Sequence, residues 1–258
     1  MKIPIYQVDA FTSKIFSGNP AAVCPLESWL DDQTMMNIAA ENNLSETAFF
    51  VRENSFYRLR WFTPVSEVDL CGHATLASAF VLFNDLRYQD EEIFFETQSG
   101  TLSVKREGGL LALNFPTRMP VPCKPPDNLI KALGVQPTAV LRWHDYLCVL
   151  ESEDQVRGLI PNQELLKTLD ADVMVTARGK SCDFVSRFFA PLYGIPEDPV
   201  TGMTHCTLIP YWAEQLGKTK LLAHQVSKRG GELHCELQGE RVKIAGQAVK
   251  YMEGVIEI

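Results

Sequence analysis

The sequence predicts an α+β protein made of two similar domains that arose by internal duplication, each a β-barrel-like sheet wrapped around a central buried helix. Two pairs of matching segments carry this prediction. Arg60-Trp61-Phe62-Thr63-Pro64 recurs 127 residues later (187 − 60) as Arg187-Phe188-Phe189-Ala190-Pro191, and Gly100-Thr101-Leu102 recurs after 131 (231 − 100) as Gly231-Glu232-Leu233. One loop insertion of four residues explains the drift. A nearly uninterrupted apolar segment follows the first pattern in each half, as expected of a helix that is buried on all sides.

The first half alternates strands with two helices. Residues 31–42 carry apolar side chains at helical spacing behind Asp31-Asp32, which are suited to cap the helix. Residues 73–83 are apolar almost all round and predict the buried helix. Runs rich in β-branched and aromatic residues predict strands at 1–9, 47–51, 57–62, 93–97 and 110–115.

The second half repeats this order after a proline-rich linker at 117–126, because proline resists both helix and inner strand. We expect an N-terminal domain over 1–116, to which residues 248–258 can return, and a C-terminal domain over 127–247. The predicted elements of the second domain are a helix from Asp127, strands near 139–150, 173–176 and 184–189, and a buried helix over 201–215. Pro210 should kink this last helix or shift its start.

Composition excludes several classes of function. The chain has 258 residues, 24 basic against 32 acidic residues and a net charge of −8, which argues against a nucleic-acid surface. No segment is long and apolar enough to span a membrane, and the first residues predict a strand rather than a secretory signal. Seven cysteines without C-x-x-C spacing are typical of a reducing cytoplasm. The five histidines have no chelating spacing, so no metal site is expected.

Glu46 is the first candidate for chemistry. In a strand with a side-chain period of two, it shares a face with Ala48 and Phe50. A carboxylate on an apolar face that loses its water acquires a pKa nearer neutrality, as a proton-shuttling base requires. The competing interpretation is a surface glutamate at a turn.

Asp198 and Cys71 form the second candidate pair, because they occupy matching places in the repeat. The competing interpretation of Asp198 is structural, since Asp-Pro commonly supplies a helix N-cap and the first helical residue. Cys71 lies at the matching helix start, where the pKa of a thiol falls. Together the two positions predict one shared site between the domains.

The helix starts at Gly72-His73 and Thr201-Gly202 add an anion-binding element to this predicted site. Exposed backbone N–H groups and the helix dipole at such a start bind carboxylates, and glycine permits close approach of a ligand. His73 can donate, accept or carry a proton; a capped core histidine is the competing interpretation. Gly18-Asn19-Pro20 has the composition of a turn.

Through these residues the chain resembles the PhzF-like family of phenazine-biosynthesis isomerases. The strings that carry the resemblance cover essentially the whole chain and are Asp9-Ala10-Phe11, Gly18-Asn19-Pro20-Ala21-Ala22-Val23, Asn43 to Phe49, Leu70-Cys71-Gly72-His73-Ala74-Thr75, Glu197 to Gly202, Ser227 to Gly231 and Gly246-Gln247-Ala248-Val249. The resemblance implies a diaminopimelate-epimerase-like fold with the active site between two alike domains. It also implies that Glu46 moves a proton between two carbons of a small cyclic acid without any cofactor, aided by Gly72, His73 and Asp198.

One position departs from the family pattern. Met203-Thr204 stands where the family usually has Ser-Ala, so a side chain that could hold a substrate hydroxyl or carboxylate is replaced by a thioether with no donor. The departure bears on substrate choice and on activity.

The leading hypothesis is therefore a cytoplasmic, cofactor-independent isomerase, with Glu46, Asp198 and His73 catalytic and Gly72, Cys71, Thr201, Gly202 and Met203 binding a small acidic substrate. Its alternatives are an epimerase or racemase that uses Cys71 and Asp198, and a binding protein of the same fold with weakened catalysis. The resemblance also suggests a homodimer.

Overall fold

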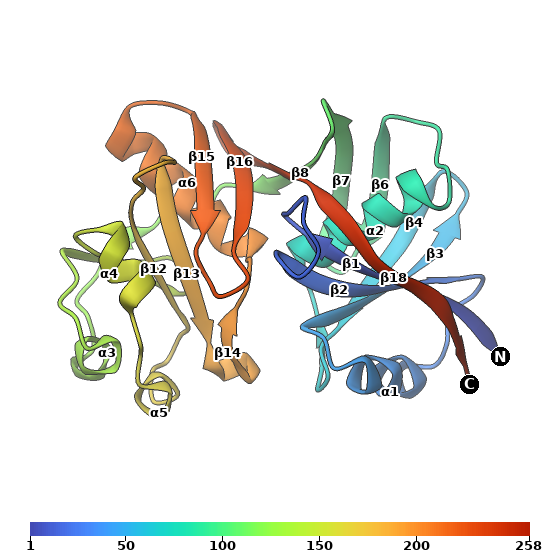
Figure 1. Ribbon diagram of the computed structural model, residues 1–258, viewed down its shortest axis with the longest axis horizontal. Coiled ribbons are helices and arrows are strands. Elements are labelled where there is room, and N and C mark those ends of the chain that lie inside the picture. The colour runs from blue at the N-terminus through green and yellow to red at the C-terminus, as the bar shows by residue number, and fades with distance from the viewer. The chain divides into compact units, whose positions relative to one another are not determined.

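The computed structural model describes residues 1–258 and divides into two compact units. Unit 1 comprises Met1–Phe115 and Ile244–Ile258, and unit 2 comprises Pro116–Lys243. Both units are mixed α/β structures with many strands and few helices (Figure 1). No helix combines the length with the apolar character that crossing a bilayer requires.

Unit 1 contains the strands and both helices that the sequence predicts, and it adds strands at 19–26, 67–68 and 100–107 that were not predicted. Its elements are β1 (Lys2–Ala10), β2 (Asn19–Leu26), α1 (Asp32–Asn42), β3 (Glu46–Glu53), β4 (Phe56–Phe62), β5 (Glu67–Val68), α2 (Gly72–Asn84), β6 (Glu92–Thr97), β7 (Gly100–Glu107), β8 (Leu110–Pro116) and β18 (Ala248–Glu257). The predicted N-cap of α1 is confirmed, because the Asp31 side chain accepts a hydrogen bond from the Thr34 N–H.

The strands of unit 1 pair in the order β18-β1-β2-β3-β4-β6-β7-β8, with the short β5 beside β4. Two of these pairs are parallel, β2 with β3 and β4 with β6, and a helix lies in each connection. All the other pairs are antiparallel. Figure 1 shows β18, the last strand, running beside β1.

Helix α2 is buried on nearly every side, as its apolar sequence predicts. Residues 72–79 and 81–83 are all buried, and the helix contacts β1, β2, β3, β7 and β18. Helix α1 packs on the other face of these strands, where Met35 and Ile38 meet Cys24 and Phe49 in one apolar cluster. Because both faces of β2 and β3 are covered, these strands are almost continuously apolar instead of alternating.

Unit 2 begins with the proline-rich segment and repeats the connection pattern of unit 1. Its elements are β9 (Val121–Pro122), α3 (Asp127–Leu133), β10 (Ala139–Arg142), β11 (Tyr146–Val149), α4 (Glu153–Gly158), α5 (Gln163–Leu166), β12 (Val173–Arg178), β13 (Phe184–Ala190), the 3₁₀ turn η1 (Pro191–Tyr193), β14 (Ile195–Asp198), α6 (Gly202–Leu216), β15 (Lys220–Gln225), β16 (Gly231–Gln238) and β17 (Arg241–Gly246), which runs into unit 1.

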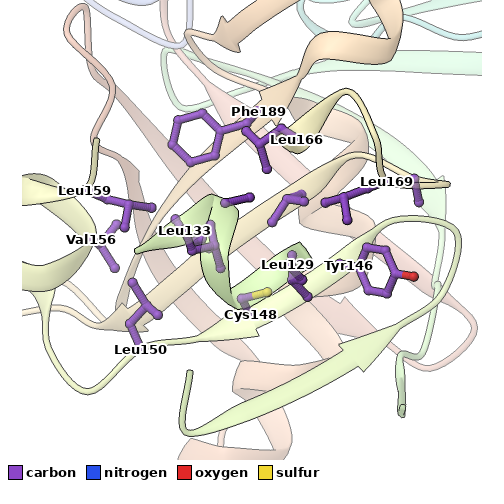
Figure 2. Packing of buried hydrophobic residues seen from close by; sticks show 14 of the residues in the cluster. Leu129, Leu133, Tyr146, Cys148, Leu150, Val156, Leu159, Leu166, Leu169 and Phe189 are labelled. Carbon is purple, nitrogen blue, oxygen red and sulfur yellow. The ribbon is translucent and has the colours of Figure 1, made fainter. Parts of the chain in front are cut away.

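The pairing order in unit 2 is β9-β10-β11-β12-β13-β15-β16, with β14 beside β13. Again two pairs are parallel, β11 with β12 and β13 with β15, and helices lie in both connections. Helices α3, α4 and α5 cover one face and enclose a core of leucines with Tyr146, Cys148 and Phe189 (Figure 2).

Pro210 neither shifts the start of α6 nor interrupts it, since the helix runs from Gly202 to Leu216 with the proline inside. A proline has no N–H to donate, so the Cys206 carbonyl four residues earlier loses its helical partner. The backbone N–H of Arg118 donates to that carbonyl instead, at 2.9 Å. The proline-rich segment thus satisfies the acceptor that Pro210 leaves open.

Candidate functional site

Strand alternation and strand register bring two polar side chains to the start of α2. Phe49 belongs to the cluster under α1, so alternation turns Glu46 to the opposite face of β3, the face that α2 covers. Glu46 is the register partner of Ala21 on β2, and Asn19 lies two residues before Ala21 on the same face. Both side chains therefore reach His73, the second residue of α2.

Glu46, His73, Asn19 and Cys71 form a compact polar cluster in unit 1. His73 Nε2 lies 3.1 Å from Glu46 Oε2, with side-chain exposures of 4% and 13%. Neither of these two atoms has a partner in hydrogen-bond geometry, so they form an ion pair rather than an aligned hydrogen bond. His73 Nδ1 lies 3.1 Å from Asn19 Nδ2 and 3.5 Å from Cys71 Sγ.

The charge state of His73 follows from these neighbours. Burial lowers the pKa of His73, whereas negative charge at Cys71 and at Glu46 raises it, and the pKa ends well above its ordinary value. Cys71 and Glu46 thus favour the protonated imidazole of His73, against the cost of burying it.

The prediction of a lowered thiol pKa at Cys71 is wrong. Cys71 is the N-cap of α2, but burial, followed by the charge of Glu46, raises the pKa of its thiol to about 11. The nearby His73 and the backbone N–H of Ala74 lower the pKa by less than these two effects raise it. A helix start makes a thiol acidic only where water or a cation can also support the thiolate.

A second polar cluster surrounds the start of α6 in unit 2. Thr201 Oγ1 donates to Asp198 Oδ2 at 2.5 Å, and Gln225 Nε2 donates to the Asp198 carbonyl at 2.8 Å. Gln225 Oε1 accepts from the Thr201 N–H at 2.8 Å. Asp198, Thr201 and Gln225 are all buried, and the hydrogen bond from the Thr201 hydroxyl helps to hold the Asp198 carboxylate in place.

The structure corrects the interpretation of Asp198 as an N-cap. Asp198 ends β14 and pairs with Phe188 of β13, while the N-cap of α6 is Thr201. A residue held in a strand ladder cannot also cap a helix that begins four residues later. By position relative to the helix, the counterpart of Cys71 is therefore Thr201, 130 residues on (201 − 71), and not Asp198.

By the same comparison, Met203 in α6 corresponds in position to His73 in α2. Each is the second residue of its helix, after Gly202 and Gly72 respectively. Met203 is half-buried, and the neighbouring Thr204 hydroxyl is occupied by the Thr201 carbonyl at 2.9 Å. Thr204 thus cannot substitute for a serine at 203.

The predicted site residues fall into two sets. Glu46, Cys71, Gly72 and His73 come together in unit 1, and Asp198, Thr201, Gly202 and Met203 come together in unit 2. Asn19 and Gln225 complete the two clusters, and the sequence did not single them out for a function. The signal for Asn19 was its place in Gly18-Asn19-Pro20. Gly18 has φ of +66°, and a Cβ there would lie 2.2 Å from the Ala10 carbonyl oxygen, so only glycine lets the chain turn into Asn19.

The unit 1 cluster also has the composition of a metal site. Glu46, Cys71 and His73 each offer one ligand atom, and these atoms lie within 4.8 Å of one another. Carboxylate oxygen, thiolate sulfur and imidazole nitrogen are all zinc ligands. The residues lie far apart or two apart in sequence, so no spacing motif could have indicated them.

Comparisons with known proteins agree with the resemblance of the sequence. Residues 8–254 match the family described as phenazine biosynthesis-like protein. An uncharacterized isomerase of Pseudomonas aeruginosa is 53% identical over 100% of both chains. The crystal structure of a PhzF family protein from Enterococcus faecalis matches with a TM-score of 0.98 at 48% identity, covering 100% of both chains.

A more distant neighbour shares the fold alone. The structure of a hydroxyproline epimerase from Agrobacterium vitis has a TM-score of 0.65 at 11% identity, covering 99% of this chain and 92% of the other.

Proposed function

Because this chain belongs to the phenazine biosynthesis-like family, we propose that it is an isomerase that moves a proton between two carbons of a small, carboxylate-bearing metabolite. The observation that carries the proposal is the Glu46–His73 ion pair at the start of a buried helix, with 3.1 Å between Nε2 and Oε2. A carboxylate held close to an imidazolium in a nearly dry site is a suitable proton acceptor and donor.

Glu46 performs the proton transfer in this proposal. Its carboxylate takes a proton from an activated carbon of the substrate, and the electron pair of that C–H bond delocalises over the conjugated acid. The resulting Glu46 carboxylic acid then returns the proton to another carbon of the same molecule. No atom is gained or lost overall, and no cofactor is needed.

The start of α2 binds the substrate anion. Cys71 makes no side-chain hydrogen bond that caps this helix, and Gly72 adds no side chain between the backbone and a ligand. Backbone N–H groups at such a start, together with the helix dipole, favour a carboxylate by about 0.3–1 kcal/mol or more when partly buried. His73 adds its positive charge as negative charge develops on the substrate.

The two units derive, in this proposal, from one duplicated unit, so that each has a buried polar cluster at a helix start. The repeated pairing order supports the duplication. Each parallel pair in unit 1 has a counterpart in unit 2. Before each helix start, a strand arginine pairs with a glutamate, Arg60 with Glu67 and Arg187 with Glu197. Asp198, Thr201 and Met203 remain predicted substrate contacts.

Solvent exchange tests the proposal without knowledge of the natural substrate. The protein is incubated in deuterated water with a panel of small cyclic and conjugated carboxylic acids, and NMR follows deuterium uptake and double-bond migration. We expect Glu46→Gln to reduce the rate by about 100- to 10,000-fold while binding persists, because general acid–base groups contribute on that scale. Glu197→Gln is the matched control, since Glu197 pairs with Arg187 at a strand edge. Equal rates for Glu46→Gln and wild type would exclude Glu46 from the mechanism.

An epimerase acting at one carbon is the second candidate. The contact of 3.5 Å between Cys71 Sγ and His73 Nδ1 favours it, because an imidazole beside a thiol can exchange a proton with it. An epimerase would incorporate solvent deuterium without migration of a double bond, and Cys71→Ser would abolish that incorporation. Migration that survives in Cys71→Ser would reject this candidate.

A further inference from the structure

We propose that Glu46, Cys71 and His73 bind a zinc-class divalent cation, and that the bound cation inhibits the proton transfer proposed above. The regulatory half of this inference rests on the proposed function, whereas the binding site itself does not. Two elements supply the ligands: β3 supplies Glu46, and the start of α2 supplies Cys71 as its N-cap and His73 in its first turn.

The separations between ligand atoms suit a cation. Two nitrogen or oxygen ligands on a tetrahedral zinc ion, each bonded at about 2.0–2.1 Å, lie about 3.3 Å apart. His73 Nε2 and Glu46 Oε2 are 3.1 Å apart, yet their geometry does not make a hydrogen bond. Both atoms are thus buried without an aligned hydrogen-bond partner, and one cation bound to both would satisfy them.

Cys71 completes the set with a soft ligand. Its Sγ belongs to the same group of atoms, all within 4.8 Å. A tetrahedral ion would hold sulfur about 3.6 Å from a nitrogen ligand, so a rotation of the Cys71 side chain that moves Sγ by up to about 1.2 Å (4.8 − 3.6) makes it the third protein ligand. A thiolate together with an imidazole selects zinc and its neighbours over magnesium or calcium.

Asn19 orients the His73 imidazole through its other ring nitrogen, Nδ1. Its side-chain amide lies 3.1 Å from His73 Nδ1 and is completely buried. When Nε2 binds a metal, Nδ1 carries the proton and needs an acceptor. The Asn19 amide meets this need with its oxygen turned to Nδ1, and its nitrogen and oxygen are interchangeable by a rotation that ordinary structures do not resolve.

Inhibition follows from the identity of the ligands. The oxygen of Glu46 that would accept a substrate proton is the oxygen that faces the proposed ion, so one atom cannot serve both. Glu46 is the most exposed of the three ligands, with 13% of its side chain accessible, and it offers the ion a route of entry.

The binding test must first remove a competing surface group. Glu232 lies 3.3 Å from His224 Nε2 and 3.2 Å from His234 Nε2 on the β15–β16 hairpin, and these exposed imidazoles can take zinc themselves. Calorimetric titration with Zn²⁺ alone is therefore done on the chain carrying His224→Asn and His234→Asn. We expect one zinc ion per chain, and absence of binding in this background would overturn the site as adventitious surface binding.

Cobalt substitution identifies the ligands. Co²⁺ bound by Cys71 should show a thiolate-to-metal charge-transfer band, and Cys71→Ser should abolish the band and weaken Zn²⁺ binding at least about tenfold. Glu46→Gln should weaken binding comparably. Cys123→Ser is the control, because Cys123 lies in unit 2 outside the cluster, and it should change neither property. X-ray absorption of the zinc-loaded wild-type chain gives the same answer without substitutions, and a shell lacking sulfur would overturn the proposal.

The regulatory half has its own readout. Zn²⁺ should suppress deuterium exchange in proportion to occupancy, and a chelator should restore it. If the substrate exchanges deuterium at an undiminished rate while zinc fills the site, the proposed inhibition is overturned but the zinc site is not. A chain that exchanges no substrate at all would count against the proposed function, while cobalt absorption would still decide the metal site.

Discussion

The starts of α2 and α6 occupy the same framework but carry different chemistry. Each helix follows a strand pair braced by an arginine: Arg60 binds Glu67 through both Nε and Nη2 at 2.7 Å, and Arg187 binds Glu197 in the same manner at 2.7 and 2.9 Å. Each guanidinium also lies over a phenylalanine ring two residues later, at 5.1 Å for Arg60 and 4.9 Å for Arg187.

The difference lies in how each start holds its carboxylate. Glu46 Oε2 lies 3.1 Å from His73 Nε2 without an aligned hydrogen bond, whereas Asp198 Oδ2 accepts a hydrogen bond from the Thr201 hydroxyl. The first arrangement leaves a carboxylate that can take and return a proton. The second arrangement fixes an acceptor in place. Under the proposed function, one framework would thus support a reactive carboxylate, Glu46, and a positioning carboxylate, Asp198. The side chain at the second helical residue, His73 or Met203, is the difference between the two helix starts.

Replacing His73 by the methionine of α6 should remove the chemical difference between the two helix starts. His73→Met gives α2 the residue of α6, removes the charge beside Glu46, and should slow proton transfer by about 100- to 10,000-fold in the deuterium-uptake assay. Met203→Leu is the matched control and should stay within about threefold of wild type, because leucine and methionine fill similar volumes. Equal losses in the two variants would contradict the asymmetry between the helix starts.

A second comparison concerns the side chain four residues after each N-cap, which hydrogen-bonds the N-cap carbonyl in both helices. Thr75 Oγ1 donates to Cys71 at 2.5 Å, and His205 Nδ1 lies 2.8 Å from the Thr201 carbonyl. Burial lowers the pKa of His205 from 6.5 to about 4. Folded protein therefore binds fewer protons than unfolded chain in this window, so the contribution of His205 to stability is complete above pH 6.5 and is lost as the pH falls toward 4.

His205→Thr, which copies Thr75, should remove this acid sensitivity. Urea unfolding at about pH 7 and about pH 4.5 should show a drop in the free energy of unfolding that is smaller in the variant by on the order of 2–3 kcal/mol. The smaller side chain lowers stability at both pH values, so the comparison uses the difference between them. An unchanged difference would mean that His205 does not titrate as its burial requires.

The arginine braces should differ only modestly. Arg60→Met and Arg187→Met each leave a half-buried glutamate without its partner, at a cost of about 1–3 kcal/mol. The loss should be greater for Arg187, because its Nη1 also donates to the Val156 and Leu159 carbonyls. Thermal unfolding of the two variants measures which loses more stability. A greater loss for Arg60→Met would show that the extra hydrogen bonds of Arg187 do not decide the difference.

Much of the framework could be predicted from sequence. Residues 72–84 form the buried helix because nearly every side chain in that segment is apolar, and Glu46 shares its face with Ala48 because strand alternation is a geometric rule. Both depend on local patterns alone.

Three features of the site needed the structure. The pKa of Cys71 depends on burial and on Glu46, which lies 25 residues away in sequence (71 − 46). Asp198 has the local pattern of an N-cap, but pairing with Phe188 keeps it in a strand. Asn19 reaches His73 because α2 packs against β2. Each is a long-range contact that no short motif contains.

The ionisation of His73 tests most directly whether unit 1 holds the reactive pair. Nitrogen-15 NMR of histidine-labelled protein reports the charge of the ring. We expect an imidazolium at about pH 7 in the wild type and a neutral ring in Glu46→Gln, because burial then outweighs the remaining attraction. A neutral His73 in the wild-type protein at that pH would contradict the account.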